Sequence, residues 1–229
     1  MMSNERIISP IAYIKTDFPD KFGVPRQSGR IKALKGEIVF LPKYGIEEAF
    51  RGIEEFSHLW LIFDFSLAHR DEFSPTVRPP RLGGNKRIGV FASRSPFRPN
   101  SIGLSSVKLD GIEKRDGTIV LHVSGIDLVD NTPIYDVKPY IPYSDCHSDA
   151  IGSYADLHAL DEVEVVFAQN LLTIIPENKR EALIETLRDD PRPSYKVDGE
   201  RVYTMSFAGF DVSFEVKDSI LTVIDVKKL

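Results

Sequence analysis

The chain has 229 residues, a formal net charge of −5, 42% hydrophobic residues and 28% charged residues. This composition is typical of a soluble globular protein and excludes a disordered chain, and no apolar run approaches the roughly 18 residues of a membrane-spanning helix. The single cysteine, Cys146, excludes an internal disulfide and fits the reducing cytoplasm, and the five scattered histidines offer no zinc spacing, so we expect no metal.

The first part of the chain is rich in predicted strands. Residues 45–56 have apolar side chains at helical spacing and predict a short amphipathic helix. Many strands with one or two helices are typical of an antiparallel or mixed β-barrel rather than of alternating βαβ units. The predicted strands are 7–14, 36–41, 57–66, 88–93 and two within 101–129 that turn near 115–117.

The second part of the chain reads differently. Residues 144–162 are polar and weakly periodic, and they predict a linker. A strand at 163–168 and a helix at 177–190 follow, then three strand-like runs with a hairpin turn at 208–209. We therefore expect a mainly β chain, with a β-barrel domain at 1–147 and a small α+β domain at 163–229.

The charge is distributed unevenly. Residues 1–147 hold 20 basic and 18 acidic side chains, and residues 148–229 hold 9 basic and 16 acidic ones. Residues 70–98 contain seven basic and only two acidic side chains. Such a patch can attract an anion although the whole chain is acidic, and it is equally compatible with an ordinary solvated loop.

The densest stretch of candidate binding residues is 81–105. It interleaves glycines and prolines with Arg94, Arg98 and Asn100. Glycine lets a ligand approach the backbone, and arginine offers a planar fork to a carboxylate or phosphate. The stretch therefore predicts a rigid basic loop for an anionic or zwitterionic ligand, and the alternative is a tight barrel corner.

A second group of polar residues runs from 127 to 140. In a strand, Asp136, Lys138 and Tyr140 share one face, so they can act together on one substrate group. Asp127 and Asp130 can accept hydrogen bonds from ribose hydroxyls or from an ammonium group. The alternative is a β-turn at 130–131 followed by a surface ion pair. Likewise, 24–29 is either a binding loop or an exposed turn.

Several common nucleotide and hydrolase motifs are absent from the sequence. It has no G-x-G-x-x-G after a strand, no G-x-x-x-x-G-K-[ST] and no G-x-S-x-G. A Rossmann cofactor domain, a P-loop nucleotidase and an α/β-hydrolase are therefore disfavoured.

Four segments together resemble the TrmO family (TsaA-like, formerly YaeB). They are KFGVPRQSG near the start, RPPRLGGNKRIGVFASRSPFRPNSIGLSSVKL, GIDLVDNTPIYDVKPYIPY and the late DPRPSY. The resemblance implies an S-adenosyl-L-methionine-dependent methyltransferase on a β-barrel, with a small C-terminal domain. It implies methylation at N6 of threonylcarbamoyladenosine, the modified adenosine just 3′ of the anticodon of threonine tRNA, and it implies a homodimer. Together with the single cysteine, it leads us to expect a cytoplasmic protein.

The resemblance also implies which residues bind the cofactor. An early cofactor loop is formed by Pro25, Arg26 and Gln27, and further contacts come from Arg94 and Leu104. The matching Asp-Leu-Val-Asp turn comprises Asp127, Leu128, Val129 and Asp130.

One pair of residues departs from the family pattern. Ser66 and Leu67 stand where relatives often carry His-Gln, so contacts at this place persist only through the backbone. Elsewhere the chemistry agrees with the implied roles: Arg26 or Arg94 can pair with the cofactor carboxylate, and Leu104 and Val129 can pack against adenine.

The acceptor N6 carries a proton that must leave during methyl transfer. We hypothesise that Asp136 takes it, relayed by Tyr140, while Lys138 steadies the carboxylate of the substrate. Arg81, Arg98 and Asn100 are candidates for contacts with tRNA phosphates or with the threonyl carboxylate.

Two rival functions remain open from the sequence. A non-catalytic RNA- or ligand-binding β-barrel module explains the basic patch without a cofactor. A hydrolase that uses Asp127, Asp130 and Asp136 with a divalent metal is disfavoured because no histidine accompanies these carboxylates.

Overall fold

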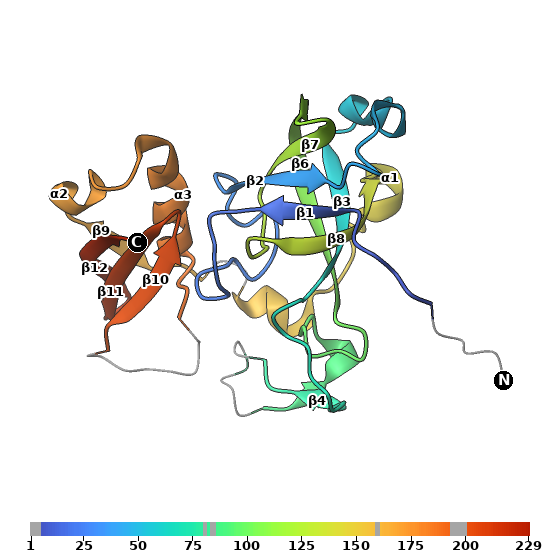
Figure 1. The fold of residues 1–229 in the computed structure, drawn as a ribbon. Coiled ribbons are helices and arrows are strands. Elements are labelled where there is room, and N and C mark those ends of the chain that lie inside the picture. The colour runs from blue at the N-terminus through green and yellow to red at the C-terminus, as the bar shows by residue number, and fades with distance from the viewer. Residues whose placement is uncertain (1–5, 80–81, 83–85, 159–160, 193–200) are drawn as a thin grey trace.

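Six antiparallel strands form a closed barrel in the order β1-β2-β7-β6-β3-β8 (Figure 1). The computed structural model describes residues 6–79, 82, 86–158, 161–192 and 201–229. The expected β-barrel is thus confirmed. Its strands are β1 (Ala12–Lys15), β2 (Lys35–Phe40), β3 (His58–Asp64), β6 (Ile102–Arg115), β7 (Thr118–Ser124) and β8 (Thr132–Pro139).

Alternating side chains explain why these segments form a barrel. In β3, the inward-facing Leu59, Leu61 and Phe63 are buried while their neighbours are more exposed. The predicted turn between β6 and β7 is confirmed, with Asp116 at φ +52° and Gly117 at φ +79°. Two consecutive residues at positive φ are typical of a two-residue hairpin turn whose twist matches the flanking strands.

Three local predictions need correction. The predicted helix at 45–56 is two short 3₁₀-helices, η1 (Glu47–Phe50) and η2 (Ile53–Glu55), because Gly52 between them is left-handed at φ +86°. The predicted strand at 88–93 is a two-residue strand, β5 (Ile88–Gly89), followed by the 3₁₀-helix η4 (Val90–Ala92). The strand expected at 7–14 begins only after Pro10, at Ala12.

A second sheet has the order β10-β11-β12-β9, with β12 and β9 parallel. Helix α3 is amphipathic, and its buried Leu183 and Leu187 belong to the same hydrophobic core as the inner face of the sheet. The expected hairpin at Ala208-Gly209 is confirmed. The elements are β9 (Glu164–Phe167), α2 (Gln169–Leu172), α3 (Glu177–Arg188), β10 (Tyr203–Phe207), β11 (Phe210–Lys217) and β12 (Ile220–Lys228). Before them, the stretch expected as a linker, 144–162, begins within α1 (Pro142–Asp145) and contains η5 (Ser153–His158).

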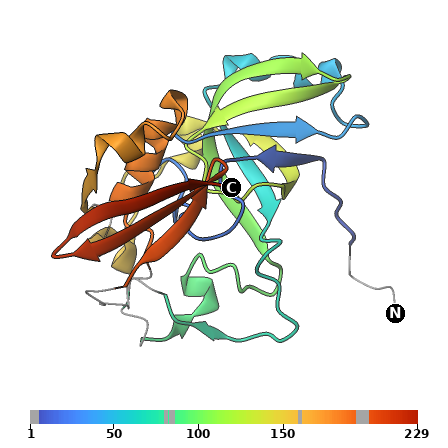
Figure 2. The ribbon, with the colours of Figure 1, turned by 60° about the vertical axis from the view of Figure 1, so that its left-hand side comes forward.

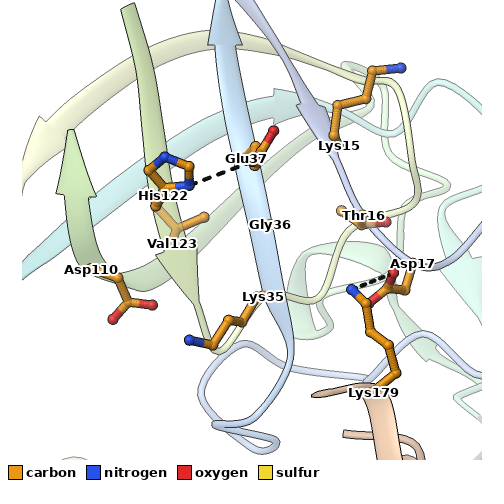
Figure 3. Close-up of a pocket in the computed structure, with 10 residues that line it drawn as sticks. All are labelled: Lys15, Thr16, Asp17, Lys35, Gly36, Glu37, Asp110, His122, Val123 and Lys179. Atoms are coloured by element: carbon orange, nitrogen blue, oxygen red, sulfur yellow. Dashed lines mark hydrogen bonds and ion pairs between the residues drawn. The ribbon is translucent and has the colours of Figure 1, made fainter. Parts of the chain in front are cut away.

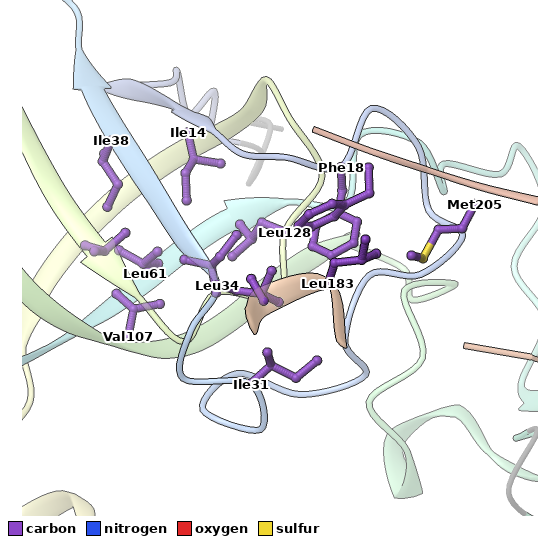
Figure 4. Packing of buried hydrophobic residues seen from close by; sticks show 14 of the residues in the cluster. Ile14, Phe18, Ile31, Leu34, Ile38, Leu61, Val107, Leu128, Leu183 and Met205 are labelled. Atoms are coloured by element: carbon purple, nitrogen blue, oxygen red, sulfur yellow. The ribbon is translucent and has the colours of Figure 1, made fainter. Parts of the chain in front are cut away.

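The loop after β1 joins the barrel to the second sheet through a continuous apolar core (Figure 4). The rings of Phe18 and Phe207 meet edge to face with centroids 5.3 Å apart. Lys179 of α3 donates hydrogen bonds of 2.6 and 2.8 Å to Asp17, and Arg30 pairs with Asp189. The second sheet and α3 together therefore hold the loop that leads to 24–29.

Residues 65–100, called the arm below, project from the barrel in both views (Figures 1 and 2). The arm contains β4 (Thr76–Val77), which pairs with β5, and also η4. Among the described residues, no helix is both long enough and apolar enough to cross a bilayer.

Candidate functional site

The turn between β7 and β8 contains a buried carboxyl group, Asp127, one of whose oxygens lacks a hydrogen-bond partner within the described ranges. Oδ1 of Asp127 is buried and has no hydrogen-bond partner among the described residues. Burial raises the pKa of Asp127 from 3.8 to about 6, while Ser105, the backbone of Ser28 and of Asp127 itself, and the charge of Arg94 oppose this rise. A buried acceptor without a donor is costly, so this oxygen is suited to a ligand that supplies one.

Two glycines hold the loop 24–29 against this turn. Gly29 donates a backbone hydrogen bond of 2.8 Å to Gly125, and Gly125 donates one of 2.9 Å to Leu34. Gly125 has φ +73°, and a Cβ there would lie 3.3 Å from Cα of Gly29. This close approach brings Ser28, and with it Gln27, to the turn that carries Asp127.

The arm contributes a cation to the same place. Nη1 of Arg94 donates a hydrogen bond to Oε1 of Gln27, and its charge also acts on Asp127. The arm segment around Arg94 is held locally, because Ser93 Oγ donates to the carbonyl of Val90 at 2.8 Å and accepts from the backbone N–H of Ser95 at 3.2 Å. Three predicted cofactor residues, Gln27, Arg94 and Asp127, are therefore brought together.

Beside this group, one edge of strand β6 has no strand partner in the part of the chain that the structure describes. Residues 102–107 pair with β3, and the ladder with β7 begins only at Lys108. Along this segment Ser105 is buried and Leu104 is 58% exposed, as the alternation of a strand requires. Leu104 therefore offers an apolar surface to a ligand.

The remaining residues of the early loop face elsewhere. Pro25 is buried, which stiffens the loop. Arg26 donates a hydrogen bond of 2.9 Å to the backbone carbonyl of Arg192, so it links the loop to the segment after α3. Within the predicted group, Arg94 is the cation that lies beside Asp127.

The two aspartates of the Asp-Leu-Val-Asp turn have different surroundings. Asp130 accepts from the backbone N–H of Thr16 at 3.0 Å and from Asn131 Nδ2 at 2.8 Å, and Lys15 lies 3.9 Å away. Between them, Leu128 is buried in the core and Val129 is half-buried. Asp130 is therefore engaged at the end of β1, and Asp127 is the acceptor that remains open.

The turn after β3 presents mainly its backbone. The side chains of Ser66 and Leu67 are exposed, and the carbonyl of Leu67 accepts a hydrogen bond from Lys21 Nζ. Just beyond, Nε2 of His69 and Oδ1 of Asp64 lie 2.7 Å apart. Position 66–67 thus lacks the side-chain contacts that His-Gln would supply, and a His–Asp pair lies next to it.

Strand register places Asp136 near Leu104 on the outer face of the barrel. Asp136 lies opposite Ile62 of β3, and Ile62 lies opposite Leu104 of β6. Two strand spacings therefore separate Asp136 from Leu104, about 10 Å. Lys138 Nζ forms an ion pair of 2.9 Å with Oδ2 of Asp136.

The proposed relay through Tyr140 is a prediction that the structure does not support. Tyr140 follows Asp136 by four residues, about 13 Å along a strand. Partial burial raises the pKa of the Tyr140 hydroxyl, and Cys146 and Asp145 add to this effect, so the hydroxyl faces α1. Its ring packs on Trp60 at 5.4 Å.

The predicted RNA contacts lie on the arm or at its end. Nη1 of Arg98 donates to the carbonyls of Ser93 at 2.7 Å and Val90 at 3.4 Å, so the guanidinium also shapes the η4 turn. Asn100 is exposed. Arg81 lies outside the described residues.

A separate polar cavity of about 430 Å³ lies between the barrel and α3 (Figure 3). Its charged groups are largely paired: Lys179 with Asp17, and Glu37 with Arg115 and His122. None of the predicted site residues lines it. Its lining comprises Lys15, Thr16, Asp17, Lys35, Gly36, Glu37, Asp110, His122, Val123 and Lys179.

The sequence interpretation included Ser28 and Ser105 in the candidate stretches 24–29 and 81–105 but did not assign them a place beside Asp127, and it missed the pair of His69 and Asp64. Ser105 was detectable as a polar residue at an inward position of β6, between Gly103 and Val107. No group of three or more His, Cys, Asp and Glu side chains that could hold a metal ion occurs in the part of the chain that the structure describes.

Comparisons with known proteins agree with this architecture. The tRNA-methyltransferase O N-terminal domain matches residues 13–146, and the TrmO C-terminal domain matches residues 161–229. The chain is 41% identical over 217 residues to the tRNA (adenine(37)-N6)-methyltransferase of Escherichia coli K12, covering 91% of this chain and 92% of that protein.

Two similar proteins come from Pseudomonas aeruginosa. A putative S-adenosylmethionine-dependent methyltransferase, RcsF, is 39% identical over 228 residues and covers 96% of both chains. A crystal structure of TrmO superposes with a TM-score of 0.79 at 33% identity, over 98% of each chain. Since both family domains match and the likeness spans nearly the whole length, the chain belongs to the tRNA-methyltransferase O family.

Proposed function

We propose that the chain is an S-adenosyl-L-methionine-dependent methyltransferase that modifies N6 of the adenosine at position 37 of tRNA, as its Escherichia coli relative is named to do. The finer proposal is that the substrate is threonylcarbamoyladenosine in threonine tRNA. The observation that carries the cofactor part of the proposal is the partnerless buried oxygen of Asp127 beside Arg94.

The residues fit the groups that this cofactor presents. The cofactor has a carboxylate, an ammonium group, ribose hydroxyls and an adenine. Arg94 offers a planar donor fork for the carboxylate, and Asp127 offers an acceptor for the ammonium or a hydroxyl. Leu104 offers 58% of its surface for apolar contact with adenine. In this assignment Pro25 stiffens the loop and Gln27 orients Arg94.

The chain's own contribution to the reaction is placement and proton transfer. When bound, the cofactor supplies a methyl group on sulfonium. Holding the acceptor nitrogen in line at about 3–3.5 Å supplies much of the rate enhancement of such a transfer. In the proposal, Asp136 accepts the N6 proton directly rather than through Tyr140, and Lys138 neutralises the threonyl carboxylate.

In this proposal the RNA approaches along the arm. Arg98, Asn100 and the basic stretch 78–87, which includes Arg81, contact phosphates or the threonyl carboxylate. Phosphate contacts of this kind set the position of the RNA without reading its sequence.

The proposal also includes a homodimer in the cytoplasm. Ile102 and Leu104 expose 40% and 58% of their surface on the outer face of β6, next to the free strand edge. A second copy that covers this face would enclose the cofactor. Sedimentation equilibrium tests the assembly: a mass of two chains is expected, and a single-chain mass at all concentrations contradicts it.

The test of the reaction uses the purified chain, labelled cofactor and threonine tRNA. One tRNA carries threonylcarbamoyladenosine and a matched one carries plain adenosine. Nucleoside mass spectrometry is expected to show a mass gain of one methyl group on the modified adenosine of the first tRNA. Methylation of the plain adenosine at an equal rate would contradict the proposal that threonylcarbamoyladenosine is the substrate. A chain that binds the RNA but ignores the cofactor would instead be the non-catalytic module.

A further inference from the structure

The arm presents an unusually exposed aromatic ring. Phe91, in η4, exposes 73% of its surface, more than any other phenylalanine that the structure describes. Phe73, also on the arm, exposes 59%. Phe97 differs, because the guanidinium carbon of Arg70 lies 3.5 Å from the centre of its ring. One face of Phe97 is therefore occupied closely. The guanidinium carbon of Arg98 also lies over the Phe91 ring, but at the larger distance of 5.8 Å from its centre, so most of the Phe91 ring, including its other face, stays exposed.

The turn that carries Phe91 is held on both sides, so the ring is presented on a fixed base. Its neighbour Val90 is buried at 1% exposure. The carbonyl of Val90 accepts hydrogen bonds from Ser93 Oγ at 2.8 Å and from Arg98 Nη1 at 3.4 Å. A side chain on a pre-ordered turn pays no backbone ordering entropy when it binds, which favours a binding role.

The charge around the ring is that of an RNA contact. The guanidinium carbon of Arg98 lies 5.8 Å from the centre of the Phe91 ring. Within 70–98, six basic and two acidic side chains lie in the described residues, in a chain whose net charge is −5. Exposed aromatic rings among arginines are typical of sites where unpaired bases stack.

The position along the chain ties this ring to the cofactor group. Phe91 precedes Arg94 by three residues, so their backbones are at most about 11 Å apart. An unpaired base on Phe91 would therefore lie close to the nucleotide that is methylated. The anticodon loop, which contains the target adenosine, supplies such bases.

We propose that the exposed face of Phe91 is a stacking platform for an unpaired base of the anticodon loop that neighbours the methylated adenosine, with Arg98 over the opposite face of the ring and within reach of the RNA backbone. This inference rests on the proposed function, because it takes the RNA to be the substrate. It assigns to this side chain a role in placing the RNA rather than in the chemistry.

The experiment compares Phe91→Ala with Phe91→Trp and, as a control on the same arm, Phe73→Ala. Fluorescence anisotropy measures binding of a labelled anticodon stem-loop RNA of threonine tRNA. Phe91→Ala is expected to weaken binding by about tenfold to a hundredfold, and Phe91→Trp is expected to keep it, because it preserves a π-face. The slope of affinity against salt should stay unchanged in Phe91→Ala, because no phosphate contact is lost.

Two further measurements separate the failure of this inference from the failure of the proposed function. Titration calorimetry should give the same cofactor affinity for Phe91→Ala as for the wild type. Sedimentation should give the same mass. The inference would be overturned if Phe91→Ala left RNA affinity unchanged or if Phe73→Ala lost as much affinity as Phe91→Ala. It would also be overturned if Phe91→Ala changed the mass in sedimentation, because Phe91 would then be a contact between two copies of the chain. A wild-type chain that binds no cofactor would overturn the proposed function whatever Phe91 does.

Discussion

Nη1 of Arg94 donates a hydrogen bond to Oε1 of Gln27, although the two residues are 67 positions apart in the sequence. This bond joins the arm to the early loop at the place where Asp127 has a buried oxygen without a partner. The candidate cofactor site is therefore built from three separate segments that meet beside the free edge of β6.

Arg94→Lys tests whether the planar fork binds the cofactor. Lysine keeps the charge but not the paired donors, so cofactor affinity should fall about tenfold or more by titration calorimetry. The control is Lys35→Ala, an exposed lysine that lines the separate cavity of Figure 3. A loss of affinity in Lys35→Ala with none in Arg94→Lys would place the cofactor in that cavity instead.

Asp127→Asn should make the folded chain more stable and should lower its affinity for the cofactor. Burial raises the pKa of Asp127 from 3.8 to about 6. Between these two pH values the Asp127 carboxyl group is therefore protonated in the folded chain and ionised in the unfolded chain. The contribution of this protonated carboxyl group to the free energy of unfolding is complete below pH 3.8 and is lost as the pH rises through about 6. At about pH 7.5, the neutral amide should therefore raise the free energy of unfolding by up to about 3 kcal/mol, measured by urea denaturation.

The same substitution has an opposite effect on binding. The ionised carboxylate is the better acceptor, so cofactor affinity of the wild type should rise with pH through about 6, and that of Asp127→Asn should be low and flat. A wild-type affinity that does not change across this range would contradict a direct role for Asp127.

Asp136→Asn tests the proton acceptor. We expect kcat to fall about a hundredfold or more while cofactor affinity stays unchanged. The matched control is Asp110→Asn, which also breaks an ion pair with a lysine two residues away, at 3.1 Å from Lys108. Near-normal kcat in Asp136→Asn would remove the base role and direct attention to the pair of His69 and Asp64.

Gly23→Ala tests how the second sheet supports the site. Gly23 has φ +95°, and a Cβ there would lie 2.0 Å from Sδ of Met205, which is fully buried. Strain and overpacking together should destabilise the chain by about 2 kcal/mol or more. Gly52→Ala, at φ +86° with open space around it, should cost only about 1 kcal/mol. Equal midpoints of thermal unfolding for the two variants would contradict this packing.

Local sequence signals predicted much of the fold. The hairpins at 115–118 and 207–210 follow from turn residues that accept positive φ, namely Asp116-Gly117 and Gly209, whereas Ala208 lies at φ +51°, a conformation that alanine rarely adopts. The long apolar run at 57–66 is β3, which pairs on both sides. The predicted helix at 45–56 was wrong because its apolar spacing is helical while Gly52 interrupts the backbone.

The site was harder to predict, because its contacts are between distant segments. In the sequence, the two carboxylates of the pattern Asp-Leu-Val-Asp look equivalent. In the structure, Asp130 accepts a hydrogen bond from the backbone N–H of Thr16, just after β1, whereas Oδ1 of Asp127 has no partner among the described residues. Shared strand faces correctly placed Lys138 beside Asp136, but they did not show that Tyr140 turns to α1. Such differences depend on which loop packs on which turn.

The most direct test of the central claim is a crystal structure of the chain with S-adenosylhomocysteine bound. We predict that its carboxylate or amino group contacts Arg94 and Asp127 and that its adenine lies on Leu104. A ligand found in the cavity of Figure 3, or held without either Arg94 or Asp127, would contradict the account.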